Sequence, residues 1–147
     1  MSLVDIDELI PIVQYAWNNT SIGCCSDDFD EESTRNKLKQ IYIDPSYYSL
    51  IYELDGFICG VMIVREACAP VNENSKYVIE ICWDADVTLS EYSRGRTLIE
   101  LFRYMKKLLK DNGLSKIIIG VKAGNSLQYY LERHGATIAE VMYLMKF

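Results

Sequence analysis

Hydrophobic positions near the start of the chain recur at helical spacing. After Asp5, apolar residues fall three and four positions apart, which places them on one helix face. Asp5 with Glu8 forms a capping-box-like pair at the start of this helix. A second, shorter helix should end before Pro45, because the residue preceding a proline avoids helical geometry. The apolar positions are Ile6, Leu9, Ile10, Val13, Ala16 and Trp17 in the first helix and Leu38, Ile41 and Tyr42 in the second.

The middle of the chain alternates between apolar segments and turn residues, a pattern typical of strands. Tyr47–Leu54 and Phe57–Val64 flank Asp55-Gly56, which predicts a hairpin with a tight turn. A polar loop from Ala69 to Ser75 then leads to a third strand, Tyr77–Trp83. Three consecutive strands of this kind predict an antiparallel meander.

The next segment is the clearest helix in the sequence. Its apolar stripe covers Leu98–Leu109, its basic residues lie off the stripe, and Asp111–Gly113 stops it. Lys116–Val121 is a short apolar run typical of a strand that is covered on both faces. A brief helix capped at Asn125-Ser126 follows, and a last strand is expected from about Thr137 to Phe147.

The order of these elements predicts an α/β (α+β) fold. The strand–helix–strand unit that follows the meander favours a parallel crossover. We therefore expect a mixed, mostly antiparallel central sheet with helices on both faces. A length of 147 residues fits one domain, and residues 1–147 are predicted to form it.

Composition is that of a globular protein. Half of the residues are hydrophobic, which suffices for a core, and no apolar run approaches the roughly 20 residues of a membrane span. Met1–Asp5 lacks the basic and apolar regions of a signal peptide. The five scattered cysteines contain no CxxC motif, which predicts reduced thiols and no metal site. We expect a cytoplasmic protein without membrane association.

Charge is distributed unevenly along the chain. The net charge of -6 disfavours non-specific binding to nucleic acid. Up to Glu91, five basic residues face seventeen acidic ones, whereas from Arg94 to Lys122 eight basic residues oppose only Glu100 and Asp111. This basic segment is either a solvated helix face or a surface that binds an anion.

A motif at the start of the basic segment carries a resemblance to a known family. Tyr92–Ile99 follows a predicted strand, opens the clearest helix, and resembles the R/Q-x-x-G-x-G/A signature of the GNAT N-acetyltransferase superfamily. In that family, backbone N–H groups at this helix start hold the CoA pyrophosphate. Asn125 and Tyr129–Ala136 resemble the family's C-terminal motif, and the similarity spans about residues 5 to 147.

The resemblance implies a set of contacts to acetyl-CoA, the expected co-substrate. Plain helix capping is the alternative role for Asn125. The chain departs from the family at Thr97 and Ile99, where the signature has glycines, and at Leu131, where the family usually has its general-acid tyrosine. The predicted cofactor contacts are Arg94, Gly95, Arg96, Thr97, Leu98 and Asn125.

Amine acetylation requires a base that takes a proton from the ammonium group. Glu80 is the only charged residue within Tyr77–Trp83, and many family members carry a carboxylate near this place on the strand. Apolar neighbours should raise its pKa toward neutrality. The alternative is a carboxylate that faces solvent on the polar side of the strand. Asp84 and Asp86 are further candidates.

The reaction also requires an acid for the departing thiolate. Tyr130, next to Leu131, is the candidate, and Tyr129 is a second choice. A core aromatic is the alternative role for Tyr130. The lone histidine, His134, lies in the last helical turn, which favours a capping or dipole role.

Together these features predict an acetyl-CoA-dependent N-acetyltransferase that transfers an acetyl group to a primary amine by direct attack. The acidic N-terminal half favours a cationic amine, whose identity stays open. The competing interpretation is a catalytically degenerate GNAT-fold protein. Short phage-encoded members resemble this chain in their weak glycine signature and missing tyrosine, and some are virion-associated or host-interaction proteins. A third option is an acyl-CoA-binding module. The many tyrosines and Trp17 could serve a homodimer interface.

Overall fold

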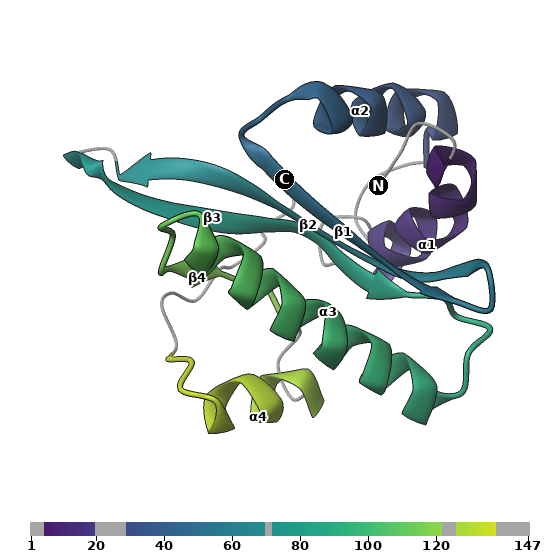
Figure 1. Ribbon diagram of the computed structural model, residues 1–147. Coiled ribbons are helices and arrows are strands. Elements are labelled where there is room, and N and C mark those ends of the chain that lie inside the picture. The colour runs from purple at the N-terminus through teal and green to yellow at the C-terminus, as the bar shows by residue number, and fades with distance from the viewer. Residues whose placement is uncertain (1–4, 20–28, 70–71, 122–125, 138–147) are drawn as a thin grey trace, which may run out of the picture.

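The computed structural model describes residues 5–19, 29–69, 72–121 and 126–137. Four helices and four strands follow one another along these residues (Figure 1). The helices are α1 (Ile6–Asn19), α2 (Glu31–Ile43), α3 (Glu91–Asp111) and α4 (Ser126–Arg133). The strands are β1 (Tyr47–Leu54), β2 (Phe57–Ala69), β3 (Asn72–Ala85) and β4 (Ile117–Ile118).

The described strands form one sheet in the order β1-β2-β3-β4. β2 pairs antiparallel with both β1 and β3, whereas β3 pairs parallel with β4. Figure 1 shows α1 and α2 on one side of the sheet and α3 and α4 on the other. The predicted α/β (α+β) fold, a mixed and mostly antiparallel sheet with helices on both faces, is confirmed.

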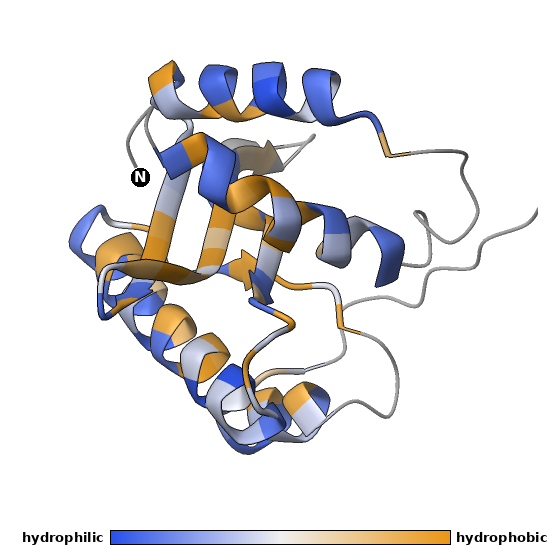
Figure 2. Ribbon diagram, turned by 90° about the vertical axis from the view of Figure 1, so that its right-hand side faces the viewer, coloured by the Kyte–Doolittle hydropathy of each residue, from blue (hydrophilic) through white to orange (hydrophobic). Residues whose placement is uncertain are grey.

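A hydrophobic core lies on each face of the sheet. Along β2, Met62 and Val64 point into the core beneath α3, whereas Val61 and Ile63 point into the core beneath α1 and α2. All four side chains are buried, because neighbouring residues of a strand point to opposite faces and both faces are covered. In Figure 2 the hydrophobic residues gather on the sheet and on the helix sides that face it.

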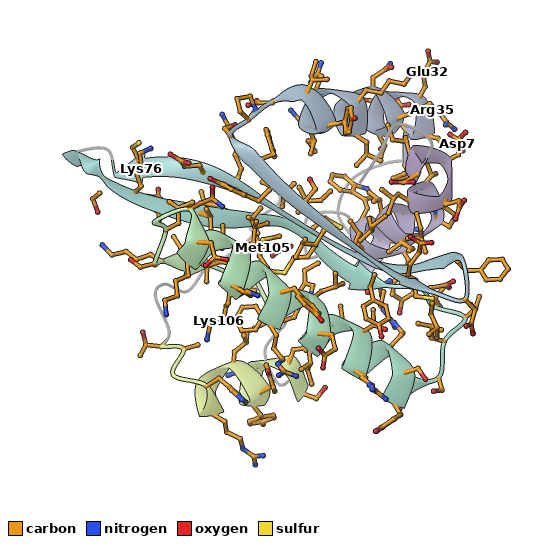
Figure 3. The ribbon with its side chains drawn as sticks, in the orientation of Figure 1. Asp7, Glu32, Arg35, Lys76, Met105 and Lys106 are labelled. Carbon is orange, nitrogen blue, oxygen red and sulfur yellow. The ribbon has the colours of Figure 1, made fainter. Side chains whose placement is uncertain are left out.

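α3 is an amphipathic helix that lies across the sheet. Met105 is fully buried on its inner side and the next residue, Lys106, is exposed (Figure 3). The indole Nε1 of Trp83 in β3 donates a buried hydrogen bond of 3.1 Å to the Leu98 carbonyl, which joins helix and strand. Among the described residues, no helix combines the length and apolar character that crossing a bilayer requires.

α1 and α2 pack together over the other face. The N-cap residue of α2 is Asp30, whose Oδ1 accepts the Ser33 N–H at 2.9 Å. Arg35 in α2 forms ion pairs with Asp7 in α1 and with Glu31 one turn before it; Figure 3 labels Arg35 and Asp7. Of these contacts, the Arg35–Asp7 ion pair joins the two helices, whose apolar sides share the core on this face of the sheet.

Two predicted segments differ from the structure, and a third lies outside the described residues. β2 reaches Ala69 and β3 begins at Asn72, so most of the predicted polar loop is strand, because the long β2–β3 ribbon pairs through its backbone whatever its side chains. β4 pairs over two residues only, and Ile118 is 46% exposed, so the prediction of a strand covered on both faces is wrong. The predicted last strand falls on residues 138–147, outside the described residues.

Candidate active site

β3 and β4 separate beside a β-bulge. Their parallel pairing ends at Ile79 and Ile118. Just beyond this pair, the register between β2 and β3 shifts and leaves Ile81 as an extra residue of β3. A bulge leaves the extra residue out of the ladder and bends its strand. Glu80 therefore lies between the last β3–β4 pair and the bulge, where the two strands part.

The Glu80 carboxylate reaches across this gap. It is half-buried, and its Oε2 accepts a hydrogen bond of 3.3 Å from the Gly120 N–H in the segment that follows β4. Burial, opposed by the Gly120 hydrogen bond and aided by the Asp84 charge, raises the pKa of Glu80 to about 7. A carboxyl group with this pKa exchanges protons near neutrality. Its burial does not fit the alternative of a carboxylate that merely faces solvent.

Arg94 is engaged in a structural ion pair. Its Nη2 lies 2.6 Å from Oδ1 of Asp84 at the end of β3, and both side chains are largely buried. Nη1 donates to the Tyr15 hydroxyl at 3.3 Å, and the guanidinium carbon lies 4.6 Å from the centre of the Tyr15 ring. Arg94 thus ties the first turn of α3 to β3 and α1. It also pairs with Asp84, one of the two further base candidates.

The residues of α3 that were predicted to contact the CoA phosphates lie inside a helix. α3 begins at Glu91 after the N-cap Ser90, so the stretch from Arg94 to Leu98 lies in its first two turns. The Arg94 N–H donates to the Ser90 carbonyl at 2.8 Å, and amides further along a helix bond to carbonyls four residues back. These amides are therefore not free to form the predicted anion cradle in this structure.

Two of these residues also belong to the core. Thr97 is 4% exposed and Leu98 is 7% exposed, and both pack toward the sheet. A Cβ atom added to Gly60 of β2 would meet the Thr97 methyl carbon at 2.6 Å. Arg96 is exposed and Gly95 is half-buried. Of the predicted contacts on α3, the Arg96 side chain remains the most accessible to a ligand.

The start of α3 retains free amides. The first N–H groups of a helix have no carbonyl partner within it. The Ser93 N–H is used, because it donates to the capping Ser90 Oγ at 3.2 Å. Among the described residues, the N–H groups of Ser90, Glu91 and Tyr92 have no backbone carbonyl partner, and they precede the residues that the signature indicates. Asn125, the remaining predicted contact, lies outside the described residues.

Tyr130 on α4 is an aromatic packed between two others. Its ring meets the Phe102 ring of α3 edge-on, with the ring centres 6.4 Å apart, and stacks on the His134 ring, with the ring centres 4.1 Å apart. His134 Nδ1 lies 2.7 Å from the Tyr130 carbonyl, as expected for a side chain that caps the helix end. Leu131 is buried, and Tyr129 is 58% exposed. These contacts favour the core-aromatic role, and the acid role of Tyr130 stays a prediction.

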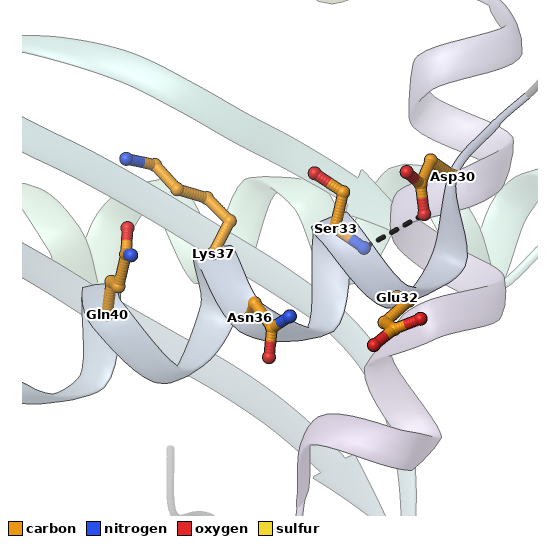
Figure 4. Close-up of a pocket in the computed structure, with 6 residues that line it drawn as sticks. All are labelled: Asp30, Glu32, Ser33, Asn36, Lys37 and Gln40. Carbon is orange, nitrogen blue, oxygen red and sulfur yellow. Dashed lines mark hydrogen bonds between the residues drawn. The ribbon is translucent and has the colours of Figure 1, made fainter.

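A hollow on the outer side of α2 has no part in this site. Its volume is about 410 Å³, and it contains none of the predicted site residues (Figure 4). Among the described residues, no group of three or more His, Cys, Asp or Glu side chains is arranged to hold a metal ion. The residues that line the hollow are Asp30, Glu32, Ser33, Asn36, Lys37 and Gln40.

Sequence reasoning missed three contributors to the site. Gly60 and Gly120 each interrupt an apolar run, and a glycine in such a place indicates a close approach by another group. Thr97 approaches Gly60, and Glu80 approaches Gly120. Tyr15 gave no comparable signal, because a tyrosine on a helix face is equally consistent with packing.

Comparison with known proteins clarifies the fold. No family model matches the sequence, and no curated protein is similar to it. Solved structures do match. A ribosomal-protein-alanine N-acetyltransferase from Brucella melitensis biovar Abortus 2308 has a TM-score of 0.68 and 13% identity, and the match covers 100% of this chain and 95% of that one.

Two further structures agree. A GNAT family acetyltransferase from Staphylococcus aureus has a TM-score of 0.69 and 13% identity, with 100% and 95% of the two chains covered. A predicted acetyltransferase with acetyl-CoA from Clostridium acetobutylicum has a TM-score of 0.70 and 10% identity, with 99% and 92% covered. The chain shares the fold of these structures, the GNAT fold. At these identities the similarity establishes the GNAT fold of this protein and leaves its activity to be argued from the site.

Proposed function

We propose that the protein is an acetyl-CoA-dependent N-acetyltransferase that acetylates a primary amine by direct transfer. One observation carries the proposal: on a GNAT fold, a half-buried carboxyl group with a pKa of about 7 stands where β3 and β4 part. A general base works best when its pKa is close to the working pH. Glu80 meets that requirement, because a pKa of about 7 lets it take up and release a proton near neutral pH.

Glu80 acts as the general base in this proposal. Its carboxylate takes a proton from the substrate ammonium group, directly or through a water molecule, and leaves a neutral amine. The amine nitrogen forms a bond to the acetyl carbonyl carbon, the bond from that carbon to sulfur breaks, and the nitrogen loses its second proton to water to give the neutral amide. Tyr130 is the proposed donor of the proton that the departing thiolate takes up.

Acetyl-CoA supplies the activated acetyl group when it is bound. The described residues fit it in part. The bulge at Ile81 leaves backbone groups outside the ladder for the acyl end, and the free amides at the start of α3 with the Arg96 side chain suit a phosphate. Arg94 does not fit, because Asp84 and Tyr15 already occupy its guanidinium group.

A non-catalytic role is the second candidate. The buried Leu131 at the family's usual tyrosine position and the helical signature residues favour it. In that case the chain would be an acyl-CoA-binding module or an interaction protein, such as the virion-associated proteins among phage-encoded members. Cytoplasmic location, a homodimer and the absence of nucleic-acid binding stay predictions under either proposal.

Two linked measurements distinguish these functions. The first is the shift of the melting temperature with millimolar acetyl-CoA. The second is the release of CoA thiol with a panel of polyamines, lysine peptides and aminoglycosides. A melting shift with thiol release supports the enzyme. A shift without release selects the binding module, and no shift selects the interaction protein.

A further inference from the structure

One hydrogen bond crosses the gap between β3 and the segment after β4. It joins the Gly120 N–H to Oε2 of Glu80, residues that are 40 positions apart in sequence. A Cβ atom on Gly120 would lie 3.7 Å from the same oxygen, an ordinary van der Waals distance. The φ angle of Gly120 is not in the left-handed region, so its backbone does not require glycine. What the site uses at this position is the N–H group.

We propose that the Gly120 amide is a positioning group for the Glu80 carboxylate. It holds the carboxylate across the gap between the strands, oriented to take a proton from the amine. This inference rests on the proposed function of Glu80 as a base. Gly120 acts through Glu80 and does not itself exchange protons.

A carboxylate in this place needs such a partner. The ionised form is disfavoured by burial, and a hydrogen bond donated to it favours the ionised form. Without the Gly120 bond, burial and the Asp84 charge would act unopposed, so the pKa of Glu80 would rise and less of it would be ionised at neutral pH. A protonated carboxyl group cannot serve as a base. The amide therefore orients the base and keeps it ionisable.

Few other charged groups bear on Glu80 among the described residues. Asp84 is the one whose charge raises its pKa, and Arg94 pairs with Asp84. Cys82, two residues along β3, has a pKa raised by burial and is a neutral thiol. Glu66 on β2 pairs with Lys76 on β3, and Lys116, just before β4, bonds to Ser75 on β3.

A pair of substitutions at one position tests the proposal. Gly120→Pro removes the N–H donor, whereas Gly120→Ala retains it, and the space is open for the methyl group. The readout is the pKa of Glu80 from a carboxyl ¹³C NMR titration, with E80Q used to assign the signal. We expect the pKa to rise in Gly120→Pro and to stay near 7 in Gly120→Ala. In Gly120→Pro, kcat/KM at pH 7 should fall about fivefold, because less of Glu80 is ionised.

A measurement on the unaltered backbone covers the case in which Gly120→Pro does not fold. The Gly120 amide ¹⁵N–¹H shift should titrate with the midpoint of Glu80 in the wild type and become independent of pH near 7 in E80Q. A Gly120 shift that does not follow Glu80, or the same Glu80 pKa in Gly120→Pro and Gly120→Ala, would overturn the proposal. These readouts need no turnover, so a missing hydrogen bond is distinguishable from a missing acetyltransferase activity.

Discussion

Thr97 on α3 packs against Gly60 on β2 so closely that a Cβ atom on Gly60 would lie 2.6 Å from the Thr97 methyl carbon. The family signature has a glycine where this chain has Thr97. Here the small residue is on the strand and the larger one is on the helix. This pairing lets α3 approach the sheet and seats the first turns of the helix next to the end of β3.

The contact predicts that Gly60→Ala destabilises the protein. The added methyl group would also meet the Leu101 Cδ1 at 3.1 Å and the Asp84 carbonyl oxygen at 3.2 Å. Overpacking of this kind costs about 1–3 kcal/mol, to be measured by urea unfolding. Adding Thr97→Ser removes the clashing methyl carbon and should recover part of the loss. Strictly additive effects of the two changes would show that the residues do not touch.

Gly95 gives a second prediction, on the helical state of the signature residues. A Cβ atom at Gly95 would have nothing within 4 Å, and its φ is not left-handed. Because the residue lies inside α3, Gly95→Ala should raise the free energy of unfolding by about 0.5–1 kcal/mol. Were the segment a loop that depends on glycine, the same substitution would lower stability. Thermal and urea unfolding of this single variant decide between these states.

The Arg94–Asp84 ion pair predicts a coupled loss. Arg94→Met leaves a largely buried carboxylate without its cation and should cost about 1–3 kcal/mol of unfolding free energy. Asp84→Asn in the same chain removes that charge and should restore part of the stability. The Arg103–Glu100 pair on the exposed side of α3 is the matched control, and Arg103→Met should have little effect. Equal losses at Arg94 and Arg103 would contradict the structural role of Arg94.

Tyr130→Phe separates the two roles of Tyr130. The ring contacts with Phe102 and His134 remain in this variant, so the melting temperature should change little. If the hydroxyl group is the general acid, kcat should fall about tenfold or more in the same preparation. An unchanged kcat with unchanged stability would assign Tyr130 to the core alone.

Much of the fold could be predicted from the sequence, because alternation in the strands and helical spacing in α1 and α3 both report which side is buried. The two-residue extent of β4 could not, because the apolar run Lys116–Val121 shows hydrophobicity but not how far a partner strand continues beside it. The helix start lies earlier than the signature suggested. The resemblance assigned phosphate binding to residues from Arg94 onward at the start of the helix, whereas Ser90 caps α3 and Arg94 already lies inside it.

Within the site, Glu80 could be predicted because a lone carboxylate in an apolar strand is conspicuous. Its partner could not be predicted, because the Gly120 amide is a backbone group 40 residues away in sequence. The two groups meet only because the β3–β4 pairing ends just before them. Arg94 illustrates the converse. Its positive charge suggested that it binds phosphate, but in the structure its guanidinium group is hydrogen-bonded to Asp84.

The central claim is that Glu80 is the base, and the pH profile of acetyl transfer tests it most directly. With an accepted amine from the panel, kcat/KM of the wild type should rise with pH through an apparent pKa of about 7, because the reaction needs the ionised carboxylate. E80Q should be slower by about tenfold or more and should lack this inflection. A rate and profile in E80Q equal to those of the wild type would remove Glu80 from the mechanism.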